Sequence, residues 1–291
     1  MTAPTTMQHQ TRGAGVDSLV GLDQDVLAPD TDIEDINPPK QARSLTWMIR
    51  LASIVFVLGG WEIVGRHINP LFMSYPSAIA VAAVRLIRSG ELLVALESSL
   101  QTLLLGFFIA SIVGVALGLL IGRYRTMEAA TDWLVNALYA TPLVAIVPLV
   151  ILWFGLGAEA KLFIVTILAV FPILINTAAG VRNVSPALID VGTAFAANER
   201  QVFTKIILPA ALPFMMTGLR LGVGRAIIGM VVAEFFTAIT GLGALIVKYG
   251  NQYDTASMFV PILVLMLLGV ALTVLLRHAE EAIAPWKRTD E

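Results

Sequence analysis

Ionisable side chains inside an otherwise apolar run are the first candidates for chemistry in this chain. Arg220, Arg225 and Glu234 stand in the run 212–237. A charged group in such a run is costly, so it usually serves an ion pair, an anchor or a water-filled path. On a helix, Glu234 would lie within ~40° of Arg220 and about 180° from Arg225. Arg220 is near the end of the run and can reach the interface, which favours an anchoring role.

Two roles stay open for Arg225 and Glu234: each could line a path for a solute or form a structural ion pair. Asn176, in the run 160–180, is a weaker candidate for the same path. A lone asparagine in a membrane more often bonds a neighbouring helix. The candidates for a translocation path are therefore Asn176, Arg225 and Glu234.

Several kinds of reactive site are missing from the sequence. It has no cysteine, and its three histidines, His9, His67 and His278, lie far apart. Disulfides, thiolate zinc sites and cysteine nucleophiles are thereby excluded, and no metal-ligand spacing is present. No Gly-Lys dipeptide occurs, so the G-x-x-x-x-G-K-[ST] loop that cradles ATP phosphates is absent. We therefore expect that this chain is not an enzyme and binds no metal or cofactor. We also expect that it binds no nucleic acid, because its net charge is only −2.

The composition places these residues in a lipid bilayer. Of 291 residues, 57% are hydrophobic and 14% are charged, whereas soluble domains average about 25% charged residues. A helix needs about 20 apolar residues to cross the hydrocarbon core. This rule predicts an all-α polytopic membrane protein with six transmembrane helices, at about 46–66, 98–122, 131–154, 160–180, 212–237 and 258–277. Gly114, Gly118 and Gly122 form overlapping GxxxG patterns that allow a second helix to approach closely.

The distribution of charge predicts the orientation and the domain boundaries. With the amino terminus in the cytoplasm, internal segments carry twelve Lys and Arg residues and external segments five. The positive-inside rule then places both termini in the cytoplasm. Residues 1–43 hold seven Asp and Glu and are expected to be a disordered acidic tail. The other predicted segments are the first span with an external interfacial segment (44–97), a transmembrane core (98–278) and a cytoplasmic tail (279–291).

The cytoplasmic loop at 181–211 is unusually long for a connector. Ser185 and Pro186 predict a helix start, and apolar residues at helical spacing extend that helix to about residue 196. Asn198 with Gln201 three residues later predicts a capping box and a second short helix before Pro209. An ordinary loop lying on the bilayer is the simplest interpretation of such a segment; two protruding amphipathic helices are the alternative.

The spacing within this loop resembles the EAA motif of ABC-importer permeases, which reads E-A-A, then G, then I-x-L-P. The matching positions run through the whole loop: Asp190 for the glutamate, Val191 and Gly192 for the alanines, Ala196 for the glycine, and Ile206, Leu208 and Pro209 at the end. Ala196 departs from the motif, because an alanine is strained where the glycine needs a positive φ. Asn198 tolerates that geometry and could form the bend instead.

The resemblance covers about residues 50–278. The segment at 153–157 (WFGLG) and the run at 231–236 (VVAEFF) are similar to the nitrate/sulfonate/taurine/bicarbonate-type branch of the binding-protein-dependent importer superfamily. The resemblance implies the type I ABC-importer permease fold. It also implies a permease subunit that moves a small solute, such as nitrate, a sulfonate or taurine, into the cell by alternating access. The implied location is the bacterial inner membrane, among its lipids.

The resemblance also implies the partners. A separate cytoplasmic ATPase, which holds ATP and Mg, would dock on the loop; an external or periplasmic binding protein would deliver the solute. Two ATPases require two permeases, most simply a homodimer. We expect apolar contact from Phe195, Val202 and Phe203 and a polar rim from Glu199, Arg200 and Lys205. The coupling residues are predicted to be Asp190, Val191, Gly192, Phe195, Ala196, Asn198, Glu199, Val202, Phe203, Ile206, Leu208 and Pro209.

Two other classes of protein are alternatives to an ABC-importer permease. An ion-coupled secondary transporter would be expected to show internal repeats or several buried carboxylates, and Glu234 is the only strong candidate for one. A membrane-embedded enzyme would need a cluster of catalytic side chains, and no such cluster is visible in the sequence.

Overall fold

The computed structural model describes residues 40–237 and 239–283, with side chains from residue 46 onward. All regular elements in these ranges are helices. The predicted tail at 1–43 lies almost wholly outside the described residues, as does most of the tail predicted at 279–291. The chain divides into two compact units, residues 1–56 and 57–291. The first contributes the start of helix α1 (Lys40–His67), and the second contains all the other helices.

Five described helices are long and apolar enough to cross a membrane. They are α1, α3 (Glu91–Arg123), α6 (Ala158–Arg182), the helix at 199–237 that includes α9 (Leu208–Thr237), and α11 (Thr255–Ile283). Helix α3 begins seven residues before the predicted span at 98–122. The described chain is thus that of a multi-pass membrane protein.

The predicted span at 131–154 is broken. Helix α4 (Arg125–Ala140) is followed by the short helices η2 (Leu143–Ile146) and α5 (Val147–Phe154), and the two parts meet at 83°. Thr141 has an extended backbone with ψ 135°, because a proline disfavours helical geometry in the residue before it, here Thr141 before Pro142. The number of spans reaches six when this bent pair is counted as one.

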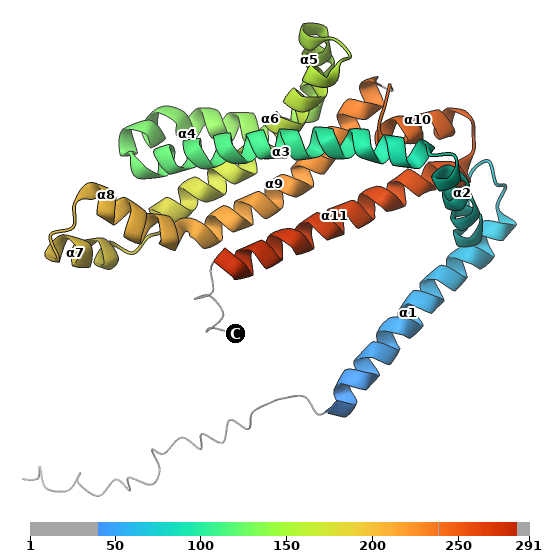
Figure 1. The fold of residues 1–291 in the computed structure, drawn as a ribbon, viewed down its shortest axis with the longest axis horizontal. Coiled ribbons are helices and arrows are strands. Elements are labelled where there is room, and N and C mark those ends of the chain that lie inside the picture. Colours follow the sequence, from blue (N-terminus) through green and yellow to red (C-terminus); the bar gives the residue numbers. More distant parts are fainter. Residues whose placement is uncertain (1–39, 238, 284–291) are drawn as a thin grey trace, which may run out of the picture. The chain divides into compact units, whose positions relative to one another are not determined.

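Helix α6 is the central element of the bundle and packs against both α3 and α9 (Figure 1). In its most apolar stretch 61% of the residues are buried, compared with 22% in α3. A Cβ atom on Gly114 would lie 3.0 Å from the carbonyl oxygen of Val170, and one on Gly118 would lie 2.7 Å from that of Leu174. The GxxxG glycines therefore let α3 approach α6 closely, as predicted.

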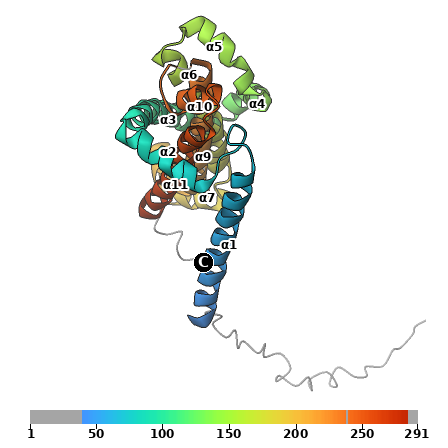
Figure 2. The ribbon, with the colours of Figure 1, turned by 90° about the vertical axis from the view of Figure 1, so that its right-hand side faces the viewer.

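The predicted interfacial segment contains helix α2 (Pro76–Arg88), which begins at its proline. Helix α2 packs near α3 and α11, and α10 (Leu242–Asn251) lies at the same end of the unit (Figure 2). A buried apolar cluster joins these helices, with Ile79, Leu86, Leu242 and Val260 among its members. The opposite end of the unit carries α7 and α8 (Figure 1).

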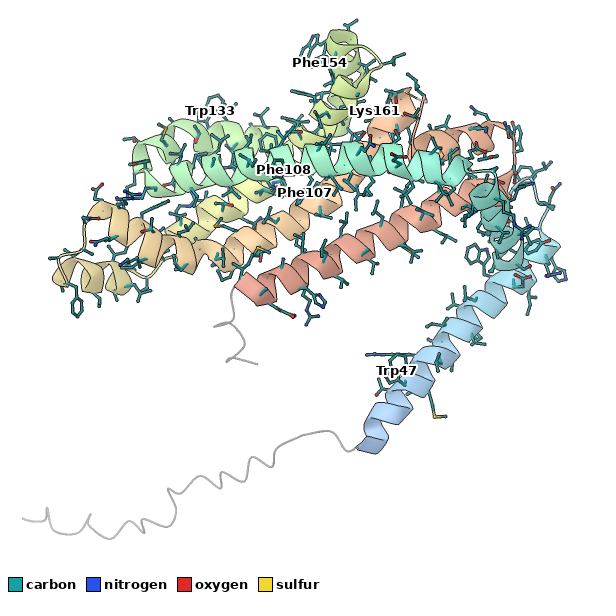
Figure 3. The ribbon with its side chains drawn as sticks, viewed as in Figure 1. Trp47, Phe107, Phe108, Trp133, Phe154 and Lys161 are labelled. Atoms are coloured by element: carbon teal, nitrogen blue, oxygen red, sulfur yellow. The ribbon has the colours of Figure 1, made fainter. Side chains whose placement is uncertain are left out.

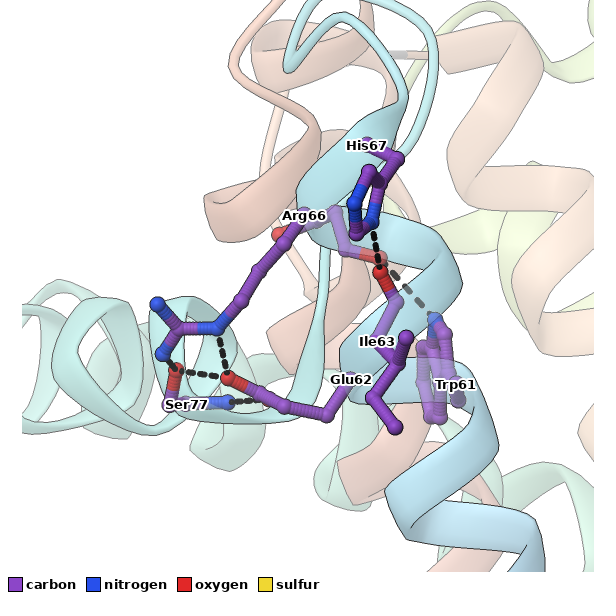
Figure 4. A network of polar contacts seen from close by, with 7 residues as sticks. Trp61, Glu62, Ile63, Arg66, His67 and Ser77 are labelled. Carbon is purple, nitrogen blue, oxygen red and sulfur yellow. Dashed lines mark hydrogen bonds and ion pairs between the residues drawn. The ribbon is translucent and has the colours of Figure 1, made fainter.

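The end of α1 is fixed to the start of α2 by a polar network (Figure 4). The Glu62 carboxylate accepts hydrogen bonds from the backbone N–H of Ser77 at 3.0 Å and from its hydroxyl at 2.7 Å. Arg66 donates to the same carboxylate at 2.7 Å. The indole of Trp61 donates to the carbonyl of Ser74 at 2.9 Å. Glu62 thus caps the first turn of α2, where a carboxylate complements the helix dipole.

Candidate functional site

The protruding loop folds as two helical segments. Helix α7 (Pro186–Ala194) begins at Pro186, with Ser185 in the N-cap position but making no side-chain capping bond. Helix α8 (Glu199–Val202) begins with the predicted capping box. The Asn198 side chain accepts from the Gln201 backbone, and the Gln201 side chain accepts from the Asn198 backbone, both at 2.9 Å. The sequence therefore predicts both helix starts correctly.

The second loop helix does not end before Pro209. Helix α8 runs into a π-helical turn, η3 (Phe203–Ile207), and then directly into α9. The Leu208 N–H bonds the Phe203 carbonyl five residues earlier. A π-helical turn contains one residue more than an α-helical turn. Pro209 follows this turn, and it has no N–H to donate to the carbonyl four residues earlier. The prediction of a separate second helix is wrong, because α8 and η3 continue without a break into α9.

An apolar cluster anchors the loop to its two spans. Val202, Phe203 and Ile206 pack against buried residues of α6, α9 and their connections, including Val181 and Ala211. Gly192 is buried where the loop segments meet. A Cβ atom there would stand 2.7 Å from the Cδ1 of Ile206. The small residue at position 192 thus allows α7 to pack against the helix that continues into α9.

Helix α7 turns a second apolar face outward. The side chain of Phe195 is 84% exposed, and Leu188 and Val191 are also exposed. By contrast, Val202 and Phe203 are half-buried in the loop's own cluster. The structure therefore divides the three residues predicted to supply apolar contact to a partner. Only Phe195 is uncovered.

The polar coupling candidates lie on the surface of the same loop. Asp190, Asn198 and Glu199 are exposed, while Leu208 and Pro209 are half-buried near the start of α9. The described residues contain no group of three or more His, Cys, Asp or Glu side chains that could hold a metal ion.

Ala196 occupies a backbone position that favours glycine. Its φ is +52°, and it follows α7 with the two hydrogen bonds of a Schellman motif. The Ala196 N–H bonds the carbonyl of Thr193 at 2.9 Å, and the Ala197 N–H bonds that of Gly192 at 3.0 Å. Asn198 has an ordinary extended backbone with φ −75°. The suggestion that Asn198 takes over the bend is therefore wrong, and Ala196 carries the strain.

Replacing Ala196 by glycine should stabilise the loop. A left-handed alanine costs roughly 1–2 kcal/mol, and a glycine loses part of that gain through its freer unfolded chain, so we expect a net gain of about 0.5–1 kcal/mol. Thermal unfolding of the purified chain in detergent would measure it. Ala194→Gly, inside α7, should destabilise by a similar amount; a lower melting temperature for Ala196→Gly would contradict the assignment of strain.

Glu234 is fully buried and both of its carboxylate oxygens are used. The Ser99 hydroxyl donates to one oxygen at 2.6 Å, and the Gly243 backbone N–H donates to the other at 2.7 Å. Ser99 in turn accepts from the Leu242 N–H at 2.8 Å. Gly243 and Leu242 form the start of α10, so Glu234 and Ser99 satisfy amide groups that a helix leaves open there. The carboxylate therefore holds α3, α9 and α10 together.

Lys161 lies near this carboxylate and was not identified from the sequence. Its side chain is 5% exposed, on the first turn of α6 (Figure 3). The ammonium group donates to the carbonyl of Thr240 at 3.0 Å and to its hydroxyl at 3.2 Å, and it attracts the charge of Glu234. One signal could have found it, namely a lysine next to a run at 162–175 that contains no charged residue and only one polar one, Thr166.

A shallow cavity of about 530 Å³ lies beside this cluster, between the starts of α3 and α10. At its edge the carboxylate of Glu91 accepts hydrogen bonds from Lys248 and from Tyr249. The bond with Glu91 raises the pKa of the Lys248 ammonium group. The pair thus adds a polar contact between α3 and α10.

The other candidates for the path have different surroundings. Arg220 does not meet Glu234 but pairs with Glu280 of α11. Asn176 is half-buried, and its amide donates to the carbonyl of Pro172 on the same helix at 2.8 Å. Arg225 is exposed on α9. The structure therefore does not bring the three candidates together.

Known proteins share both the sequence and the fold of this chain. The sequence profile of the family described as "Binding-protein-dependent transport system inner membrane component" matches residues 114–285. A putative aliphatic sulfonates transport permease of Bacillus subtilis (strain 168) is 30% identical over 90% of this chain and 96% of its own length. The taurine transport system permease of Escherichia coli (strain K12) is 27% identical over 86% of this chain and 97% of its own length.

A solved structure supports the likeness of fold. The MetNI methionine ABC transporter, in an inward-facing conformation, contains a chain that aligns with a TM-score of 0.52. The alignment covers 64% of this chain and 93% of that one, at 21% sequence identity.

Proposed function

Because this chain belongs to the family of binding-protein-dependent transport system inner membrane components and is a permease subunit of an ABC importer, we propose that it carries an aliphatic sulfonate, such as taurine, into the cell. The similarity extends over nearly the whole length of the relatives that are named for aliphatic sulfonates and for taurine, which supports this class of solute. Nothing in the described residues favours an ion-coupled transporter.

The proposed assembly contains two copies of this chain in the bacterial inner membrane, with both termini and the 181–211 loop in the cytoplasm. Two ATPase subunits bind ATP and Mg and dock on the two loops. An external binding protein delivers the solute to the opposite side. This arrangement accounts for a chain that contains no phosphate-binding loop of its own.

One observation carries the proposal: α7 presents an uncovered apolar face on a loop that is firmly joined to two spans. Phe195 stands outward on this face, and an amphipathic helix in a partner's groove is a common mode of recognition. The cluster that contains Phe203 joins the loop to α6 and α9. A displacement of α7 by the ATPase is thereby passed to both helices, which can open or close a path between them.

The division of labour can be tested by reconstitution. The purified chain in liposomes should show no ATP hydrolysis, because it lacks a nucleotide site. Adding the ATPase and the binding protein should produce ATP-dependent uptake of taurine or ethanesulfonate. Hydrolysis by the chain alone would refute the proposal. Uptake driven by an ion gradient without ATP would instead identify a secondary transporter.

A further inference from the structure

Arg225 stands on a face of α9 that the rest of the second unit leaves uncovered. Arg225 is exposed, and so are Leu221 and Ile228, one turn to either side. The opposite face of the helix is buried, with Ala226 and Met230 in the cluster that faces α6. The guanidinium group therefore points away from the packed bundle, toward whatever covers this face in the assembly.

Arg225 also lies deep within its span. It is roughly 18 Å along the helix from Thr237 and roughly 25 Å from Leu208, at 1.5 Å per residue. An arginine side chain reaches only part of such a distance. Holding its charge in hydrocarbon without a partner is costly. This face of α9 must therefore meet water or an anion at that depth.

The long spans that pack against α9, namely α3, α6 and α11, offer Arg225 no carboxylate along their apolar stretches. Between residues 98 and 122, 162 and 181, and 255 and 276 the described spans contain no charged side chain. Arg220 pairs with Glu280, and Glu234 is enclosed by Ser99 and Gly243. A second copy would bring a second Arg225 and the same neutral helices. Neither these three helices nor their copies in a second chain therefore supply a counter-ion for the guanidinium, and an anion that arrives through water can do so.

We propose that Arg225 is the anion-recognition group of the translocation path and binds the acidic head group of the solute as it crosses. The guanidinium presents a planar fork of N–H donors that matches two oxygens of a sulfonate, carboxylate or phosphate. The inference rests on the proposed function, because it assumes a solute path along α9, and it narrows the solute to an anion or a zwitterion with an exposed acidic group.

Charge substitution tests the recognition step. In liposomes that contain the full assembly, Arg225→Gln should reduce the kcat of ethanesulfonate uptake at least tenfold, and Arg225→Lys should retain more uptake than Arg225→Gln. Arg277→Gln is the matched control, because it removes a positive charge at the far end of α11 and should leave uptake within twofold. Equal uptake by Arg225→Gln and the wild type would overturn the proposal.

The absence of cysteine from the chain allows a second test. Arg225→Cys would give this chain a single thiol, and it should react with charged, water-soluble methanethiosulfonates. A trimethylammonium reagent restores a positive charge and should restore uptake, whereas a sulfonate reagent should not. Phe195→Cys is the accessible reference and Ile173→Cys the buried one. An unreactive cysteine at 225, or equal rescue by both reagents, would overturn the proposal.

The two tests separate this inference from the proposed function. If the wild-type assembly takes up no sulfonate, the proposed solute is wrong. Reactivity at position 225 still decides the inference, because it measures access from water without any transport. A reactive cysteine then supports an anion path for another solute, and an unreactive one excludes the path.

Discussion

Replacing Phe195 by aspartate should lower ATP-driven uptake roughly a hundredfold and leave the amount of folded chain in the membrane unchanged. The side chain is almost fully exposed, so the fold gains little from it. An aromatic anchor buried in a partner's groove commonly contributes about 2–4 kcal/mol to binding, and a charge in its place adds a desolvation cost. Uptake by the reconstituted assembly and co-purification of the ATPase would measure the effect.

Two further variants show whether the loss belongs to docking. Thr193→Asp puts the same charge on α7 about 200° around the helix from Phe195 and should leave uptake near the wild-type level. Phe203→Asp should instead reduce the yield of folded chain, because that side chain packs in the loop's own cluster. Wild-type uptake by Phe195→Asp, with the ATPase still bound, would contradict the assignment of α7 as the docking helix.

Local patterns in the sequence predicted the helix starts and the spans, because these features depend on residues that are close together in the chain. The starts of α7 and α8 follow from Pro186 and from the Asn198–Gln201 capping box, whose partners are three residues apart. Long apolar runs located the spans, since a span must present apolar side chains to lipid along its whole length. The break before Pro142 was also signalled locally, but the length of the apolar run hid it.

Contacts between distant segments were beyond the reach of the sequence. Ser99, Lys161, Glu234 and Gly243 meet only after four helices have packed, and the sequence around each of them does not identify the other three. Helical periodicity placed Arg220 and Glu234 on a similar face of α9, but Arg220 is bound to Glu280 of α11. The periodicity of the loop likewise gave Phe195 and Phe203 the same weight, because it cannot show which apolar face the loop uses for its own packing.

Replacing Glu234 by alanine should destabilise the folded chain by roughly 3 kcal/mol or more. The carboxylate is fully buried, and its loss leaves the Gly243 N–H without its acceptor and Lys161 without the nearby opposite charge. Each such group costs about 1–3 kcal/mol when unsatisfied, and more when charged. A lower melting temperature in detergent and a lower yield would register the effect. Glu97→Ala, an exposed residue on the same helix end as Ser99, should change stability by less than about 0.5 kcal/mol.

A double variant separates a structural role of Glu234 from a role on the path. If the carboxylate acts by balancing Lys161, then adding Lys161→Met to Glu234→Ala should recover part of the lost stability, because a buried charge without a partner costs more than an apolar pair. Glu234→Gln keeps one acceptor and one donor for Ser99 and Gly243, so it should lose less than Glu234→Ala. An unchanged melting temperature for Glu234→Ala, accompanied by lost uptake, would instead show that the carboxylate serves the solute. The buried position would then have to open during transport, and α10 would have to move away from α9.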